Sequence, residues 1–312
     1  MNKQILFLYT NPSQKSTLLF LEEAIKSVFR KFRKGICVKY RLIDFSASCR
    51  EAVKKILAED INSTDGILYY GDTYGETEFF KDSLCAFSVQ YFSGNHSIFS
   101  PVSLEEAKRT DSVITNTSST DIADIEKTVF QALDEAKSRN KSVIICTDSH
   151  SKSDSLLYDG IENCLANTRE YDITHYEFGE LIYTFTRSIP QFDAIICSMD
   201  KADVIKMHIN SLNKFPLAYS ILYTDKCRIY KREAVPFEDL SNLSYASLIV
   251  AAGNMIEKEL GYKSIGQHIK KSARLAIEKC CYTEKAEFQK EVLMQINTPL
   301  RNRRVKANES NN

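Results

Sequence analysis

The chain has 312 residues, and its 41 basic and 41 acidic side chains give a formal net charge of zero. A neutral chain lacks the long-range field that holds nucleic acid or an anionic membrane surface, so we expect neither of these partners. Hydrophobic residues make up 43% and charged residues 26% of the chain, a composition that excludes disorder as its main state and allows a sizeable core.

Targeting and cysteine patterns indicate the compartment. No apolar run reaches the ~18 residues that a membrane span needs, and the first residues resemble neither a signal peptide nor a transit peptide. The nine cysteines include no C-x-x-C pair, which favours reduced thiols in a cytosol-like compartment. We therefore expect a cytoplasmic protein and leave a mitochondrial location open. Cys146 lies close in sequence to Asp148 and His150, and we interpret this as chance rather than as a catalytic thiol with its base.

The first part of the chain alternates apolar β-branched runs with amphipathic stretches. The expected strands are 5–9, 38–45 and 66–70, and the expected helices between them are 18–32 and 49–57. Gly35 follows the first of these helices and is expected to stop it.

The same alternation continues through the middle of the chain. The expected strands there are 112–115, 142–147, 172–176 and 194–197. The expected helices there are 122–137, 155–163, 178–186 and 204–212. Two more strands are expected at 217–223 and 228–231. Three helices are expected after them, at 244–260, 265–281 and 283–296, and Gly261 is expected to stop the first of these helices. This order predicts βαβ units with helices on both faces of a sheet, followed by a frayed polar tail at 301–312.

Three segments carry a resemblance to a known family. Residues 190–212, PQFDAIICSMDKADVIKMHINSL, resemble the stretch P-x-x-F-D-V-I-V-T-x-N-x-x-G-D-I-L-S-D of the isocitrate/isopropylmalate dehydrogenases, the β-decarboxylating dehydrogenases. Residues 241–261, SNLSYASLIVAAGNMIEKELG, resemble the helix A-N-P-x-A-x-I-L-S-A-x-M-M-L-x-x-L-G of that family. Residues 128–150, TVFQALDEAKSRNKSVIICTDSH, resemble its A-F-x-x-A-x-x-R-x-K-x-V-x-x-V-x-K-A-N.

The resemblance implies an α/β fold of the isocitrate/isopropylmalate dehydrogenase type, with two α/β domains flanking a central cleft. A large, discontinuous domain would comprise residues 1–95 plus 228–300, and a small domain 96–227 would carry the helices of the dimer seam. In this family the active site lies in the cleft and is completed by a second subunit. The family oxidises a 2-hydroxy acid by hydride transfer to NAD(P) and then releases CO2, with a divalent metal that stabilises the enolate.

The metal site of the family is only partly kept. Where the family has G-D-I-L-S-D this chain has A-D-V-I-K-M, so Asp203 is retained and Met207 stands at the second aspartate. A thioether is a poor ligand for a hard cation such as Mg2+ or Mn2+. The third aspartate falls near Glu180, so Asp203 and Glu180 are the candidate metal ligands. The alternative is a solvated Asp203 at a helix start and a surface Glu180.

The other catalytic groups of the family are missing or changed. Its catalytic lysine falls on Asp148 or Ser149, and the arm that carries its tyrosine is absent between the strand and the helix at 112–127. Its substrate arginines fall in 79–94, where Lys81 is the cation that remains as a candidate substrate ligand. One flexible ammonium cannot replace several planar guanidinium groups that also orient a substrate.

The cofactor segment of the family is also reduced. Its loop before the A-N-P helix is replaced by the shorter EAVPFED at 233–239, which has neither histidine nor glycine. Asn242 is the candidate for the asparagine that contacts adenine, although an asparagine at a helix start has a capping role by default. NAD and Mg2+ or Mn2+ are therefore expected cofactors only if the chain is an active enzyme.

Loss of these groups with retention of the apolar pattern favours a catalytically inactive relative that serves as a structural or regulatory subunit or a dimerising homologue. The first alternative is an active NAD- and Mg/Mn-dependent oxidative decarboxylase of the isocitrate or 3-isopropylmalate type. The second is an unrelated α/β binding module.

The resemblance implies a homodimer, or a heteromer with a related dehydrogenase subunit. The contact would involve the helices at 178–186 and 204–212. The candidate interface residues are Val204, Ile205, Ile209 and Leu212. Burial of these side chains inside the monomer explains their apolar character equally well.

Overall fold

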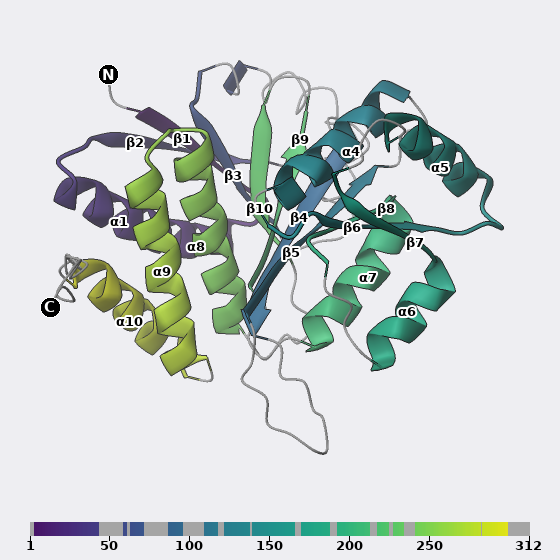
Figure 1. The fold of residues 1–312 in the computed structure, drawn as a ribbon. Coiled ribbons are helices and arrows are strands. Elements are labelled where there is room, and N and C mark those ends of the chain that lie inside the picture. Colours follow the sequence, from purple (N-terminus) through teal and green to yellow (C-terminus); the bar gives the residue numbers. More distant parts are fainter. Residues whose placement is uncertain are drawn as a thin grey trace, which may run out of the picture.

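One mixed sheet organises the molecule (Figure 1). The computed structural model describes residues 3–43, 59–60, 63–71, 87–95, 109–117, 122–137, 139–165, 170–187, 192–212, 217–224, 227–233, 241–281 and 283–298. The strands within these residues are β1 (Lys3–Tyr9), β2 (Ile36–Leu42), β3 (Gly66–Tyr70), β4 (Phe87–Asn95), β5 (Arg109–Thr117), β6 (Ser142–Thr147), β7 (Asp172–Glu177), β8 (Ala194–Ser198), β9 (Leu217–Tyr223) and β10 (Arg228–Arg232). Their order in the sheet is β2-β1-β3-β10-β9-β4-β5-β8-β6-β7.

The direction of the strands divides this sheet into two parallel regions with an antiparallel middle. The pairs β2–β1, β1–β3 and β3–β10 are parallel, and so are β5–β8, β8–β6 and β6–β7. The pairs β10–β9, β9–β4 and β4–β5 are antiparallel. We call the part from β2 to β10 the first half and the part from β9 to β7 the second half.

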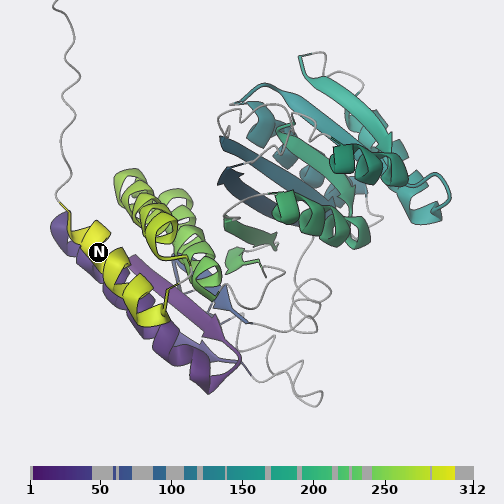
Figure 2. The same ribbon diagram turned by 90° about the horizontal axis from the view of Figure 1, so that it is seen from below.

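Helices pack on both halves (Figures 1 and 2). The helices are η1 (Pro12–Gln14), α1 (Lys15–Lys31), α4 (Ile122–Lys137), α5 (Lys152–Leu165), α6 (Phe178–Arg187), α7 (Met199–Leu212), α8 (Ser241–Lys258), α9 (Lys263–Cys280) and α10 (Lys285–Asn297). The first half gathers α1, α8, α9 and α10, whereas the second half carries α4 to α7. No helix in the described ranges is both long enough and apolar enough to cross a lipid bilayer.

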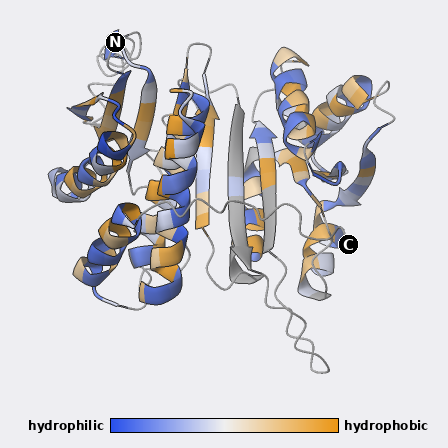
Figure 3. Ribbon diagram, turned by 60° about the vertical axis from the view of Figure 1, so that its left-hand side comes forward, coloured by the Kyte–Doolittle hydropathy of each residue, from blue (hydrophilic) through white to orange (hydrophobic). Residues whose placement is uncertain are grey.

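Alternate residues of the strands in the second half face two separate cores. Val113, Val143 and Ala194 pack in one cluster with the buried faces of α4 and α5. The neighbouring residues Ile114 and Ile144 pack in the other cluster with α6 and α7. Because successive side chains of a strand point to opposite faces, α4 and α5 cover one face of the sheet and α6 and α7 cover the other. Figure 3 shows hydrophobic residues gathered on the strands and on the helix surfaces that face them.

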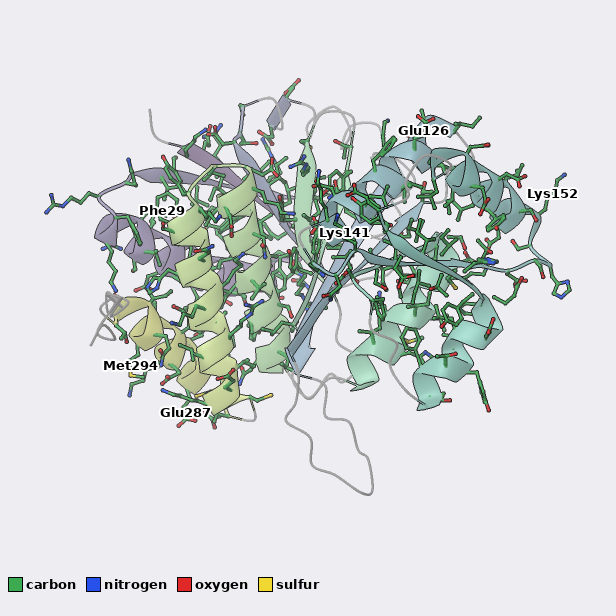
Figure 4. All side chains as sticks on the ribbon, viewed as in Figure 1. Phe29, Glu126, Lys141, Lys152, Glu287 and Met294 are labelled. Carbon is green, nitrogen blue, oxygen red and sulfur yellow. The ribbon has the colours of Figure 1, made fainter. Side chains whose placement is uncertain are left out.

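The helix α1 forms because its apolar residues recur every three or four positions. Leu18, Leu21, Ile25 and Phe29 are buried along one face. Phe29, labelled in Figure 4, lies on the side of α1 toward α9. Its ring meets that of Tyr262, the residue before α9, edge to face with centroids 5.4 Å apart.

The end of α1 differs from the expected one. Arg33 has a φ of +54°, and the N–H of Lys34 donates to the carbonyl oxygen of Phe29 at 2.9 Å. The left-handed residue that ends the helix is therefore Arg33, and the expectation that Gly35 takes this role was wrong. At the end of α8 the expected glycine does take it, because Gly261 has a φ of +76°.

Most expected elements are confirmed within the described residues, and one strand was missed. The helix at 122–137 and the strands at 142–147 and 217–223 have the expected bounds. The helices α5 and α7 begin three and five residues earlier than expected, at Lys152 and Met199. The strand β4 was not expected, because its residues had been assigned to the segment of the substrate arginines. The expected helix at 49–57 and the tail at 301–312 lie outside the described residues.

The place of β4 in the sheet bears on the expected domain boundary. β4 lies between β9 and β5, both of which belong to the expected small domain 96–227. The sheet therefore groups β4 with the second half, although the sequence assigned residues 1–95 to the large domain.

Candidate functional site

The carboxylate retained from the metal pattern, Asp203, lies in α7, the helix that follows β8. Its Oδ1 accepts a hydrogen bond from Nζ of Lys206 at 2.7 Å. Residues three positions apart share a helix face, which places this ammonium beside the carboxylate. Asp203 therefore already has a cationic partner from its own helix.

The same ammonium reaches a second carboxylate from another part of the chain. Nζ of Lys206 donates to Oε2 of Glu233 at 3.1 Å, and Nζ of Lys231 lies 3.2 Å from Oε1 of the same carboxylate. We call Asp203, Lys206, Lys231 and Glu233 the charge cluster. The Glu233 side chain is 4% exposed and the Lys206 side chain 15%, so water provides little of their solvation.

The strands position Glu233 for these contacts. Glu233 follows β10 directly, and its N–H donates to the carbonyl oxygen of Ala218 in β9 at 3.0 Å. Lys231 lies two residues earlier on the same face of β10. The charge cluster thus joins α7 of the second half to the end of β10 in the first half.

Within the charge cluster, the surroundings of Lys206 and Glu233 favour the ionised form of each. Burial alone would raise the pKa of Glu233, but the ammonium groups of Lys206 and Lys231 outweigh it and hold this pKa well below its ordinary value. Burial alone would lower the pKa of Lys206, but Glu233 and Asp203 raise it above the ordinary value of a lysine. Lys206 and Glu233 are therefore both charged near neutral pH.

These residues do not fit a divalent metal. The position between Asp203 and Glu233 holds the ammonium of Lys206, and a second cation there would be repelled. Met207 stands at the second metal position, and its side chain is 51% exposed. Glu180 is exposed on α6. In the described ranges, no three His, Cys, Asp or Glu side chains are grouped so as to hold a metal ion.

The candidate cofactor residue Asn242 is occupied by the fold. It is buried at the start of α8, and its Nδ2 donates to the carbonyl oxygens of Cys280 at 2.9 Å and Thr283 at 2.8 Å. An amide nitrogen has two hydrogens, and both are used here to hold the connection between α9 and α10. Asn242 therefore has no donor left for an adenine base.

The turn after β1 is closed by its own side chains. Oε1 of Gln14 accepts hydrogen bonds from the backbone N–H groups of Thr10 and Asn11, each at 3.1 Å. Oδ1 of Asn11 accepts one from the N–H of Ser13 at 3.0 Å. Backbone N–H groups at such a turn are the donors that bind phosphate, and here three of them already have partners.

A buried ion pair at the carboxyl ends of β6 and β8 was missed by the sequence reasoning. Nζ of Lys201, at the start of α7, lies 2.9 Å from Oδ2 of Asp154 in α5, and both side chains are buried. The same carboxylate accepts the backbone N–H of Asp148 at 2.8 Å. The pair connects the starts of α5 and α7 at the carboxyl ends of β6 and β8. Burial raises the pKa of the adjacent Cys146 thiol to about 12, so this cysteine is not a thiolate nucleophile at neutral pH.

A second group that the sequence did not predict links the two halves on the face of the sheet opposite to the charge cluster. The hydroxyl of Tyr91 in β4 donates to Oε1 of Glu135 in α4 at 2.7 Å, and Nζ of Lys258 in α8 donates to the same oxygen at 3.0 Å. The ring of Tyr91 stacks on Tyr219 of β9 with centroids 4.7 Å apart. We call Tyr91, Glu135 and Lys258 the α4–α8 bridge.

The candidate interface residues have different environments. Ile205 and Ile209 are buried inside the chain in the cluster beneath α6 and α7, so burial in the monomer accounts for both. Val204 is half-buried, and the side chain of Leu212 lies outside the described parts, as does Lys81. Among the described side chains of these two helices, the large apolar ones that are exposed are Tyr183 on α6, at 55%, and Met207 on α7, at 51%.

Comparisons with known proteins identify the fold. No protein-family model and no curated protein matches this chain. Among solved structures, isocitrate dehydrogenase from Methylococcus capsulatus matches with a TM-score of 0.71 at 11% identity, over 94% of this chain and 99% of that one. The TT0538 protein of Thermus thermophilus matches with a TM-score of 0.72 at 12% identity, over 98% of this chain and 70% of that one. The chain therefore has the α/β fold of the isocitrate dehydrogenases.

Proposed function

We propose that this chain is a catalytically inactive relative of the isocitrate/isopropylmalate dehydrogenases that serves as a structural or regulatory subunit. The observation that carries the proposal is the contact between Asp203 and Lys206 at 2.7 Å. A dehydrogenase of this type needs a divalent cation at that carboxylate to polarise the hydroxyl of its substrate. A carboxylate that already binds an ammonium from its own helix does not supply that site.

Two further contacts support the absence of catalysis. Both amide hydrogens of Asn242 hold the connection between α9 and α10, and Gln14 occupies two backbone donors in the turn after β1. Asn242 lies where the resemblance places the asparagine that contacts adenine, and the turn after β1 has the kind of backbone donors that bind phosphate. Each is used to stabilise the fold, which is the expected outcome when a scaffold is kept without its ligand.

The surface of α6 and α7 supports a role in assembly. We assign the contact to a second copy of this chain or to a related dehydrogenase subunit, through the exposed side chains of Tyr183 and Met207. Tyrosine and methionine are enriched in the central parts of protein interfaces. Ile205 and Ile209 lie beneath this surface and keep the helices in place.

The proposed assembly is tested by its response to a charge on this surface. Met207→Asp places an unpaired carboxylate in the contact, so we expect the association constant to fall at least tenfold, which corresponds to ~1.4 kcal/mol. Analytical ultracentrifugation of the purified chain measures self-association. Mass spectrometry of the complex purified from its own cells identifies a related dehydrogenase subunit, if the assembly is a heteromer.

The matched control is Phe130→Asp on α4. Phe130 is 55% exposed, close to the 51% of Met207, but it lies away from α6 and α7. We expect this variant to assemble as the unmodified chain does. The proposed interface would be contradicted if the chain is monomeric both when purified alone and when isolated from its own cells. Equal losses of association in Met207→Asp and Phe130→Asp would also contradict it.

A further inference from the structure

The charge cluster has the arrangement of a cation site whose cation is a side chain. Nζ of Lys206 lies 2.7 Å from Oδ1 of Asp203 and 3.1 Å from Oε2 of Glu233, so one ammonium bridges two carboxylates. Lys231 neutralises the other oxygen of Glu233 at 3.2 Å. Two carboxylates and two ammonium groups leave the cluster with no net charge.

The contact of Lys206 with Glu233 is needed because Glu233 is buried. A carboxylate that is 4% exposed has lost most of its hydration and has to be compensated by cations and hydrogen bonds. Lys231 supplies one cation from the same strand, and Lys206 supplies the other from α7. The contact of Lys206 with Glu233 also connects α7 to the end of β10, which lies in the other half of the sheet.

We propose that the ammonium of Lys206 is a built-in counter-ion that takes the place of a divalent cation, and that removing it turns Asp203 and Glu233 into a divalent cation site. The inference deepens the proposed function, because the cluster then positions the α7 surface without any metal. The unmodified chain accordingly has no use for Mg2+ or Mn2+ at this place.

The donor set of the vacated site would suit these ions. Mg2+ is often bound by one or two carboxylates and keeps several waters. Asp203 and Glu233 would supply the carboxylate oxygens, and the Asp203 side chain is 30% exposed, which leaves a route for the ion and its waters. Without Lys206 the cluster would carry two carboxylates against the single ammonium of Lys231.

The test compares Lys206→Met with the unmodified chain by thermal unfolding, with and without millimolar MnCl2. Methionine is unbranched like lysine and only one atom shorter, and it removes the charge. We expect the melting temperature of the variant to fall by several degrees and to recover by at least about 2–4 °C with Mn2+, whereas the unmodified chain does not respond.

Two further variants separate a specific site from a general effect of salt. Lys270 also bridges two groups, Glu257 at 2.7 Å and Asn254 at 3.0 Å, but only one of them is a carboxylate. Lys270→Met is therefore expected to lose stability without any recovery in Mn2+. The double variant Asp203→Asn/Lys206→Met keeps the neutral pair of Glu233 and Lys231, so it should be more stable than Lys206→Met in the absence of metal and insensitive to Mn2+.

The outcomes of this experiment decide the inference. Stabilisation of the unmodified chain by Mn2+ that Asp203→Asn abolishes would overturn it, as would a folded Lys206→Met variant without a response to Mn2+. If Lys206→Met does not fold without metal, the double variant carries the test, and a response of that variant to Mn2+ overturns the inference. None of these outcomes depends on the assembly through α6 and α7, so the proposed function and this inference can fail separately.

Discussion

His268 shows how a single buried side chain makes the fold sensitive to pH. It lies in the N-terminal half of α9, and its Nε2 lies 3.0 Å from the carbonyl oxygen of Ile296, near the end of α10. A carbonyl oxygen only accepts hydrogen bonds, which assigns the hydrogen to Nε2. Burial, together with Lys31 and Lys271, lowers the pKa of His268 below the ordinary value of 6.5, although the contact with Ile296 opposes this.

The pH dependence follows from the sign of this shift. The folded chain favours the neutral ring more than the unfolded chain does, so the contribution of His268 to stability is present above pH 6.5 and is lost as the pH falls through the folded-state pKa. We expect the free energy of unfolding to fall between pH 7.5 and pH 5.5, and to fall less in His268→Gln, which keeps a donor without the charge. Urea unfolding at the two pH values measures both. His150→Gln in an exposed loop is the control, and an equal fall in His268→Gln and the unmodified chain would exclude His268 as the cause.

The charge cluster explains why part of the site was not predictable from the sequence. Asp203 and Lys206 are three residues apart on one helix, and Lys231 and Glu233 are two apart at the end of one strand, so each pair could be read locally. The contact between the two pairs, from Lys206 to Glu233, joins residues 27 positions apart. It depends on the arrangement of the sheet, in which β10 lies beside β9 of the second half. No local pattern reports a contact of this kind.

At the scale of elements, local patterns were sufficient for most helices and strands. The strands β6 and β9 consist mostly of apolar residues, and all but one of their side chains are buried. The strand β4 was missed because most of its residues had been assigned to the segment of the substrate arginines, and the serines and the glycine of FSVQYFSGN do not favour a strand. Its pairing is supplied by β5 and β9 on either side, which is a property of the whole sheet.

The packing of α8 on α9 depends on two glycines that bring the helix backbones together. A Cβ built at Gly266 would lie 2.4 Å from the carbonyl oxygen of Gly253 and 2.9 Å from Cβ of Glu257. Neither is the flexible end of a side chain, so the helices would have to move apart. Small residues are therefore required at this crossing.

This close approach predicts the effect of adding one methyl group. Gly266→Ala is expected to lower the free energy of unfolding by about 1–3 kcal/mol, because overpacking strains the contact between α8 and α9. Gly179→Ala in α6 is the matched control, since a Cβ there meets nothing within 4 Å. In a helix, alanine is better than glycine by about 0.5–1 kcal/mol, so this control should be slightly stabilised. Urea unfolding measures both, and a stabilised Gly266→Ala would contradict the packing described.

At the scale of the whole molecule, polar groups on both faces of the sheet connect its two halves. Tyr230 and Lys231 are successive residues of β10 and therefore face opposite sides. The α4–α8 bridge lies on the side of Tyr230, and the charge cluster lies on the side of Lys231. Each joins a helix of the second half to an element of the first. The boundary between the two halves is thus bridged on both faces by polar and charged groups of the chain itself.

We propose that this fold has been retained without dehydrogenase chemistry, and an assay of NADH formation decides this proposal. The assay uses the purified chain and its native complex, with isocitrate or 3-isopropylmalate, NAD and MnCl2, and follows absorbance at the NADH band. We expect no NADH above the blank from the purified chain, and activity in a native heteromer only from its related subunit. Metal-dependent NADH formation by the purified chain that Asp203→Asn abolishes would contradict it.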